Sequence, residues 1–201
     1  MKELIVSGRT ATVERVTSET RIQVSLVVDG QGKTDVRTGV GFLDHMVELL
    51  GRHAYMDLTV KAEGDTQIDA HHSVEDVGIA LGQALVKALG DKKGIRRFGS
   101  VRVPMDEALA EVTLDLSGRA FLVYNVPDLP EKVGDYDSEL TEDFLQALAT
   151  NGGMNLHVNV PYGRNGHHVN EAIFKGLAKA LADAVSLEPR EKGIPSTKGV
   201  L

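Results

Sequence analysis

The chain contains an imperfect internal repeat, and no other feature of the sequence limits its possible folds as strongly. The motif H-H-x-x-E at residues 71–75 recurs at residues 167–171, an offset of 96 positions. Each copy opens a stretch in which apolar residues return every three or four positions, the spacing of a helix with one buried face. Two similar halves are therefore expected.

The similarity between the halves extends upstream of the motifs. It covers a strand pattern that ends in glycine, a helical pattern, and a second strand pattern. The paired segments are 19–30 with 107–118, 44–50 with 142–148, and 56–62 with 154–160. Each half is thus predicted to be α+β, with helices packed on largely antiparallel sheets.

The glycine-rich turn at 90–94 marks the expected boundary between the halves. We therefore assign residues 1–92 to the first half and residues 93–201 to the second. The tail at 188–201 is too rich in proline and glycine to form a helix.

Composition and charge exclude several functional classes. The chain has no cysteine, so disulfides are excluded and a metal site must use nitrogen and oxygen ligands. Its formal net charge of −7 argues against general nucleic-acid binding. No apolar run is long enough to span a bilayer, and the first residues lack the apolar stretch of a signal peptide. A cytoplasmic protein without membrane or nucleic-acid partners is expected.

The repeated histidines predict metal binding. Residues three or four apart on a helix share a face, so each glutamate converges with the histidines of its own motif. Adjacent histidines point roughly 100° apart, so one motif cannot easily place both rings on one ion. The alternative is a duplicated helix start with solvated histidines and a glutamate that favours the helix dipole. That alternative does not explain four histidines placed identically in both halves.

The ligand types limit the identity of the metal. Imidazole and carboxylate without thiolate suit Mn²⁺, Fe²⁺, Co²⁺, Ni²⁺ or Zn²⁺, and more than four ligands favour octahedral Mn²⁺. His53 and His157 stand outside the repeated motifs.

Several cations lie beside glycines or at segment ends, where arginine forks and backbone amides commonly hold phosphate. They occur in the segments 94–99, 117–119 and 195–199, and Lys175 lies one turn after Glu171. Together they predict an anion pocket.

These motifs, taken together, resemble the imidazoleglycerol-phosphate dehydratase family of histidine biosynthesis. The resemblance covers nearly the whole chain and is specific because many motifs occur in order. The matching stretches are GFLDHM (41–46), DAHHSVEDVGIALG (69–82), KGIRRFGS (93–100), PMDEAL (104–109), DLSGR (115–119), GRNGHHVNEAIFKGLAKAL (163–181) and PSTKGVL (195–201).

The resemblance implies a fold, an assembly and a reaction. The fold is two β-β-β-α-β-α halves of the ribosomal protein S5 domain 2-like type. The assembly is a hollow homo-oligomer of 24 subunits, and we expect a smaller, trimer-like form without metal. The reaction is the dehydration of D-erythro-imidazoleglycerol phosphate to imidazoleacetol phosphate by a hydro-lyase with two Mn²⁺ ions per active site, at subunit interfaces.

The resemblance also implies roles for individual residues. The metal-ligand positions correspond to His45, His71, His72, Glu75, His167, His168 and Glu171, with Asp143 at an eighth position. The substrate-phosphate positions correspond to Arg97, Arg119, Lys175, Ser196 and Lys198. Glu19 matches an acidic position close to the substrate. The catalytic base stays open among Glu19, Glu75 and Glu171.

Two positions depart from the family pattern. Asp143 stands where the family usually has histidine, and it also aligns with His45 in the internal repeat. Leu49 stands where the family tends to have glutamine, which removes one polar contact. Because oxygen ligands suit a hard ion, we predict that Asp143 ligates the metal and that activity survives.

Two other functions are compatible with part of the pattern. A non-catalytic, metal-bridged assembly protein would keep the ligands and lose turnover, but it would not need the phosphate set. Another metal-dependent enzyme on a duplicated fold, such as a phosphohydrolase, is the second alternative.

Overall fold

The structure is a computed structural model, and it describes residues 8–201. The first half contains β1 (Thr10–Val16), β2 (Thr20–Val27), β3 (Thr34–Arg37), α1 (Gly41–Ala54), β4 (Asp57–Gly64) and α2 (His71–Leu89). The second half contains β5 (Phe98–Met105), β6 (Ala108–Asp115), β7 (Phe121–Asn125), β8 (Lys132–Val133), β9 (Tyr136–Asp137), α3 (Leu140–Gly152), β10 (Asn155–Tyr162) and α4 (Gly166–Val185). Apart from β8 and β9, the order of elements is the same in both halves.

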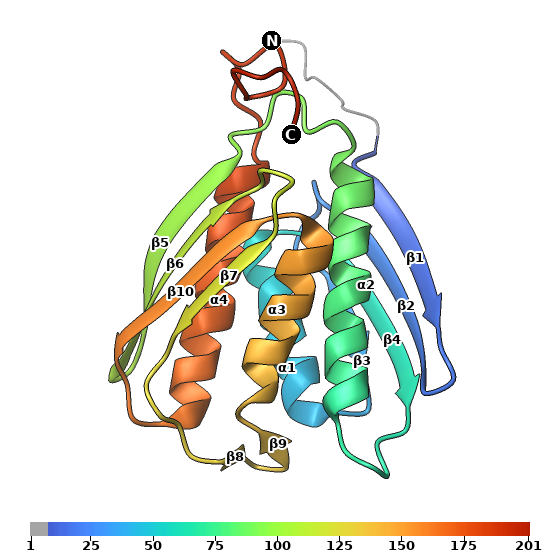
Figure 1. Cartoon of the computed structure of the whole chain (residues 1–201), viewed down its shortest axis with the longest axis vertical. Coiled ribbons are helices and arrows are strands. Elements are labelled where there is room, and N and C mark those ends of the chain that lie inside the picture. The colour runs from blue at the N-terminus through green and yellow to red at the C-terminus, as the bar shows by residue number, and fades with distance from the viewer. Residues whose placement is uncertain (1–7) are drawn as a thin grey trace.

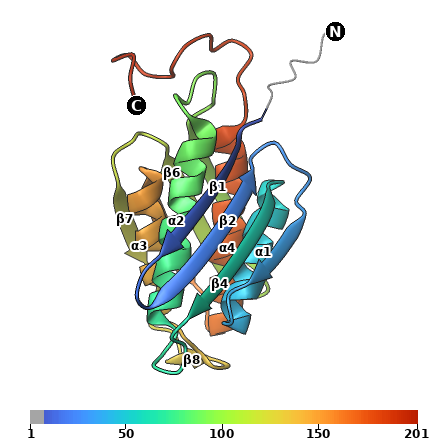
Figure 2. The same ribbon diagram turned by 90° about the vertical axis from the view of Figure 1, so that its right-hand side faces the viewer.

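Each half forms a four-stranded sheet with the same topology. The strand orders are β1-β2-β4-β3 and β5-β6-β10-β7. All neighbouring strands are antiparallel except β3 with β4 and β7 with β10. Figure 2 shows the first sheet face-on, with its helices behind it. The α+β architecture of two similar halves is confirmed, whereas the small β8–β9 hairpin was not expected from the sequence.

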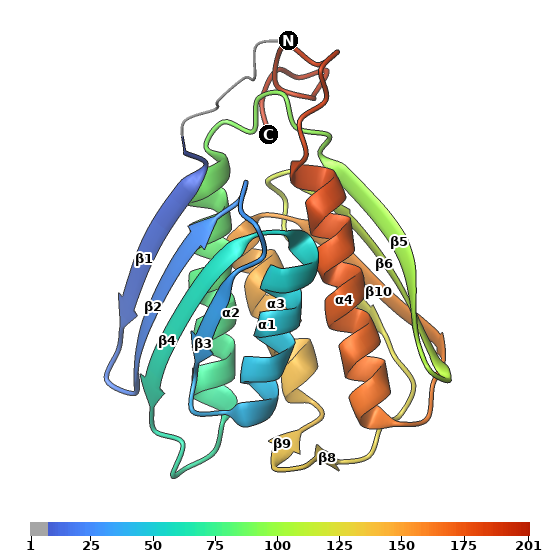
Figure 3. The same ribbon diagram turned by 180° about the vertical axis from the view of Figure 1, so that it is seen from behind.

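The four helices lie between the two sheets, which form the outer layers (Figures 1 and 3). α1 and α2 pack on the first sheet, and α3 and α4 pack on the second. The main helix pairs are α2 with α3 and α1 with α4, so each pair joins one half of the chain to the other. The buried apolar residues accordingly form one continuous core across both halves.

Small residues allow the close approach of α2 and α3. A Cβ atom at Gly78 would lie 2.7 Å from the carbonyl oxygen of Phe144, and one at Gly82 would lie 2.6 Å from the backbone nitrogen of Gly152. A larger side chain at either position would force the helices apart. The two glycines of the segment GIALG on α2 therefore allow α3 to pack closely against this helix.

All four helices begin at the same end of the molecule, and the C-terminal tail lies at the opposite end (Figure 1). The histidines of both H-H-x-x-E motifs lie in first turns, and the two motifs therefore share one end of the helical layer. No helix within residues 8–201 is long and apolar enough to cross a membrane.

Candidate metal centre and anion pocket

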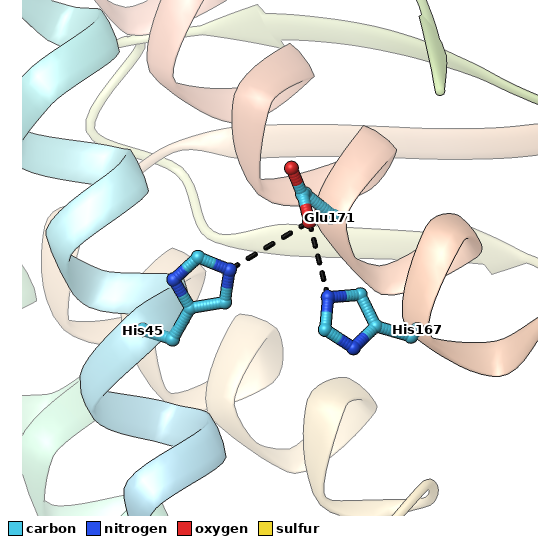
Figure 4. Close-up of side chains that lie close together, drawn as sticks. All are labelled: His45, His167 and Glu171. Atoms are coloured by element: carbon cyan, nitrogen blue, oxygen red, sulfur yellow. Dashed lines mark hydrogen bonds and ion pairs between the residues drawn. The ribbon is translucent and has the colours of Figure 1, made fainter. Parts of the chain in front are cut away.

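Two histidines and a glutamate from different halves meet between α1 and α4. His45 lies on α1, whereas His167 and Glu171 lie on α4. The Nε2 atoms of His45 and His167 are 3.6 and 3.1 Å from Oε2 of Glu171. One ligand atom from each residue lies within 4.8 Å of the other two, and Figure 4 shows both rings beside the carboxylate. We call these three residues the α1–α4 cluster.

The start of α4 is held by a side-chain cap. Oδ1 of Asn165 accepts hydrogen bonds from the backbone N–H groups of His167 and His168, at 2.9 and 3.3 Å, which is the usual role of asparagine at this position. The ring of Phe42 packs edge-on against His167, with 5.3 Å between the centroids. These contacts fix the helix start and limit the movement of the His167 ring.

Lys175 secures the carboxylate of the α1–α4 cluster from the other side. Its Nζ lies 2.5 Å from Oε1 of Glu171, whose side chain is only 10% exposed. Burial alone would raise the pKa of Glu171, but the hydrogen bond and charge of Lys175, with a contribution from His167, outweigh burial and lower it. Glu171 is therefore a charged, oriented carboxylate at neutral pH.

The other helix pair carries the corresponding residues in a more open arrangement. Nδ1 of His71, on α2, lies 3.4 Å from Oδ2 of Asp143, on α3, and both side chains are about two-fifths exposed, at 46% and 40%. Glu75 is exposed, and Ile79 occupies the position that matches Lys175 in the repeat. We call His71, Glu75 and Asp143, the counterparts of the α1–α4 cluster in the repeat, the α2–α3 cluster. Within residues 8–201, only the α1–α4 cluster has ligand atoms of all three members within 4.8 Å of one another.

The second histidine of each motif contacts a carboxylate that belongs to neither cluster. Nδ1 of His168 lies 2.7 Å from Oε2 of Glu107, and Nδ1 of His72 lies 3.0 Å from Oδ2 of Asp65. These hydrogen bonds raise the pKa of each histidine. Oε2 of Glu19 lies farther from His72 Nδ1, at 4.0 Å. The two histidines of one motif thus contact different residues, because adjacent side chains on a helix point in different directions.

The tail lines a pocket together with part of the basic set that was predicted to bind phosphate. A cavity of about 740 Å³ is lined by Arg97, Arg119, Ser196 and Lys198 among others. Lys175 does not line this pocket and instead forms an ion pair with Glu171. Because the backbone N–H of Arg97 donates to the carbonyl of Ala184 near the end of α4, the helical rise puts it roughly 20 Å from Glu171. One chain therefore does not bring the whole predicted phosphate set together.

Arg97 has protein partners within this pocket. Its Nε and Nη2 donate to Asp115 at 2.6 and 2.9 Å, and its Nη1 donates to the carbonyl of Pro195 at 2.9 Å. The guanidinium thus ties the tail to β6. This contact explains why a segment rich in proline and glycine has a defined place in the structure.

Three residues near the candidate site were missed by the sequence analysis. Glu107 directly precedes β6, just as Glu19 directly precedes β2, its counterpart in the first half. This correspondence in the repeat could have identified Glu107 as a candidate site residue. Asp65 had no such signal. His53 is the third residue. Burial lowers its pKa most, and the nearby charges of Lys175 and Lys179 lower it further. Leu49 packs against the core.

Comparison with known sequences gives a consistent result. The family model of imidazoleglycerol-phosphate dehydratase matches residues 38–181. The chain is 59% identical over 195 residues to the imidazoleglycerol-phosphate dehydratase of Acidiphilium cryptum, covering 96% of this chain and 100% of that protein. It is 57% identical over 193 residues to that of Syntrophobacter fumaroxidans, covering 96% and 98%.

Solved structures agree with the sequence comparison. The imidazoleglycerol-phosphate dehydratase of Staphylococcus aureus superimposes with a TM-score of 0.81 at 38% identity, covering 89% of this chain and 99% of that one. The enzyme of Pyrococcus furiosus, in complex with (S)-C348, gives a TM-score of 0.82 at 33% identity, covering 94% and 100%.

Proposed function

Because the chain belongs to the imidazoleglycerol-phosphate dehydratase family of enzymes, we propose that it converts D-erythro-imidazoleglycerol phosphate to imidazoleacetol phosphate. Members of this family are hydro-lyases of histidine biosynthesis. The proposal adds two Mn²⁺ ions as cofactors, further copies of this chain as partners, and the cytoplasm as the location.

The observation that carries the proposal is the meeting of His45, His167 and Glu171 from the two halves of the chain. Two imidazole nitrogens and a charged carboxylate oxygen suit a first-row divalent ion, and the chain has no thiolate to compete. The α2–α3 cluster offers the same kind of donors, with one carboxylate in place of one imidazole. The α1–α4 cluster therefore fits one metal ion, and in this proposal the donors of the α2–α3 cluster take part in holding the second.

A bound Mn²⁺ ion would act as a Lewis acid that stabilises negative charge on the substrate's imidazole ring. The protein must then remove a proton from carbon and assist the loss of the neighbouring hydroxyl, so that one water leaves in total. Lys175 keeps Glu171 charged and oriented toward the two histidines, so Glu171 acts as a ligand in this proposal.

Glu19 is our proposed base for the proton on carbon. Its carboxylate is about half exposed, at 51%, and lies 4.0 Å from His72. Glu171 is engaged by Lys175 and His167, and Glu75 belongs to the α2–α3 cluster. Glu19 lies beside a proposed metal ligand and remains open to substrate, which is the placement that a general base requires.

The anion pocket supplies the third part of the proposal. Arg97, Arg119, Ser196 and Lys198 would bind the substrate phosphate by charge-assisted hydrogen bonds. The pocket lies roughly 20 Å from Glu171 along α4, farther than a small phosphorylated imidazole reaches. We therefore propose that the tail of one copy meets a metal cluster of another, within an assembly of 24 chains that becomes smaller and trimer-like without metal.

A direct assay tests this proposal. The purified chain is mixed with imidazoleglycerol phosphate and Mn²⁺, and the ketone product is measured by mass spectrometry. Ketone formation that stops with EDTA and returns with Mn²⁺ is expected. Absence of ketone across several metals and pH values would contradict the proposal and favour the non-catalytic assembly protein.

Two lysines of the tail provide a matched pair for the phosphate role. Lys198→Ala is expected to raise KM by about 10- to 100-fold, since one charge-assisted contact is lost. Lys192→Ala, whose Nζ donates to the carbonyl of Pro189, is expected to leave KM unchanged. Equal KM values for the two variants would contradict the assignment of the anion pocket.

A further inference from the structure

The second histidine of each motif forms a hydrogen bond between its Nδ1 atom and a carboxylate outside the motif. His168 pairs with Glu107 at 2.7 Å, and His72 pairs with Asp65 at 3.0 Å. The two carboxylates come from different places in the repeat: Glu107 lies in the β5–β6 turn, whereas Asp65 directly follows β4. The two halves therefore form the same contact between histidine and carboxylate with residues from non-equivalent positions of the repeat.

Glu107 is held rigidly from both sides. Its Oε1 accepts hydrogen bonds from the backbone N–H groups of Arg164 and Asn165, at 3.1 and 2.8 Å, while its Oε2 faces His168. Asn165 in turn caps α4 through the backbone of His167 and His168. The carboxylate, the helix start and the imidazole thus form one connected unit.

A carboxylate at Nδ1 has a chemical consequence for the ring. It accepts the Nδ1 proton, so the neutral imidazole is kept as the tautomer whose Nε2 has a free lone pair. Carboxylates in this position commonly orient histidine ligands and make them better donors to a metal. Asp65 has the same relation to His72, although both of its oxygens, at 3.2 and 3.0 Å, contact the same nitrogen.

We infer that Glu107 and Asp65 are positioning residues, which hold His168 and His72 with Nε2 available to a metal ion. This inference rests on the proposed function, because it takes His168 and His72 to be metal ligands. It differs from that function in naming residues that do not contact the metal themselves.

The contacts predict different results for the two carboxamide variants. In Glu107→Gln, the two backbone N–H groups retain the single amide oxygen, so the NH₂ group faces Nδ1 of His168. The ring proton must then move to Nε2, which cannot bind metal. In Asp65→Asn, the amide is free to turn its oxygen toward His72, because both contacts of Asp65 are with that ring.

The test is a titration of the metal-free full chain with Mn²⁺, in which the free ion is measured by electron paramagnetic resonance. Glu107→Gln is expected to weaken one of the two sites by about 10- to 100-fold, and Asp65→Asn to weaken either site by less than about tenfold. Glu111→Gln on β6 is the matched control, because Glu111 contacts Asn159 and Arg102. Its titration is expected to match the unaltered chain.

The outcomes separate the inference from the proposed function. An unaltered chain that binds no Mn²⁺ contradicts both. An unaltered chain with two sites and a Glu107→Gln variant that binds equally well overturns the positioning role alone. If Glu107→Gln melts at a lower temperature without metal, Asp65→Ala provides the deciding comparison. Weaker Mn²⁺ binding by Asp65→Ala than by Asp65→Asn supports the inference. Equal Mn²⁺ binding by the two variants overturns it.

Discussion

The two helix pairs place related residues at the same end of the molecule but surround them differently. In the α1–α4 cluster, two imidazoles face a glutamate that is 10% exposed and paired with Lys175. In the α2–α3 cluster, Asp143 replaces one imidazole, Glu75 is exposed, and Ile79 stands where Lys175 would be. The repeated fold has kept the positions of the donors while their chemistry has diverged.

This difference shows which properties the fold fixes and which the side chains fix. Helix pairing across the halves brings a donor of one half to the motif of the other in both clusters. The charge and burial of each cluster then depend on single residues. We therefore expect the α1–α4 cluster to be the tighter and more nitrogen-rich site, and the α2–α3 cluster to be more open and more selective for hard ions.

Removal of the buried carboxylate is expected to have the largest effect. Glu171→Gln should remove one of two bound Mn²⁺ ions per chain and lower kcat on the order of 10³-fold, because ligands of one site act as a unit. Glu75→Gln should have a smaller effect, because water can replace an exposed ligand. Glu142→Gln, exposed on α3, is the control. Metal content and turnover measure the result, and two retained ions in Glu171→Gln would refute the assignment.

Loss of Lys175 should leave the buried charge of Glu171 without its lysine partner in the metal-free protein. Lys175→Met is expected to cost about 2 kcal/mol of unfolding free energy at pH 7. The folded pKa of Glu171 is lowered from its ordinary value of 4.5. The stabilisation is therefore complete above that value and is lost as the pH falls through the folded pKa.

Urea unfolding at several pH values measures this effect. The difference between Lys175→Met and the unaltered chain should shrink at acidic pH, and a constant difference would contradict the ion pair as its source. The counterpart Ile79→Lys, which adds a lysine beside exposed Glu75, should stabilise by no more than about 0.5 kcal/mol.

Restoring the repeat at Asp143 should change metal preference. Asp143→His makes the α2–α3 cluster more like the α1–α4 cluster, and we expect the ratio of Zn²⁺ to Mn²⁺ affinity to rise by about tenfold, since imidazole suits Zn²⁺ better. Competition between the two ions, followed by calorimetry, measures the ratio. Glu142→His places the same side chain one residue earlier and should leave the ratio unchanged. No change in Asp143→His would show that residue 143 is not a ligand.

The last prediction concerns the helix starts themselves. Among residues 8–201, Ser73 Oγ is the buried side-chain atom without a hydrogen-bond partner, and the matching residue in the other motif is Val169, which is fully buried. Ser73→Ala is therefore expected to stabilise the chain by about 1 kcal/mol. Thermal unfolding tests this, and a lower melting temperature would reveal a partner that Ser73 gains in the assembly.

Local patterns in the sequence predicted the elements and the shared helix starts, because periodicity and repeat spacing record which residues face the core. They did not predict which helices pair across the halves. The contact of α2 with α3, for example, depends on the absence of a side chain at Gly78, which lets α3 approach closely. The contact of Arg97 with Asp115 and Pro195 was also missed. Partners distant along the chain are chosen by tertiary packing, and no local pattern encodes them.

Anomalous scattering at the manganese edge, from crystals of the Mn²⁺-loaded protein, tests the central claim of two unequal metal sites most directly. We predict two peaks per chain, one beside His45, His167 and Glu171 and one beside His71, Glu75 and Asp143. Nε2 of His72 and of His168 from neighbouring copies should complete them. A single peak, or a fully coordinated ion with the Asp143 carboxylate turned away from it, would contradict the claim.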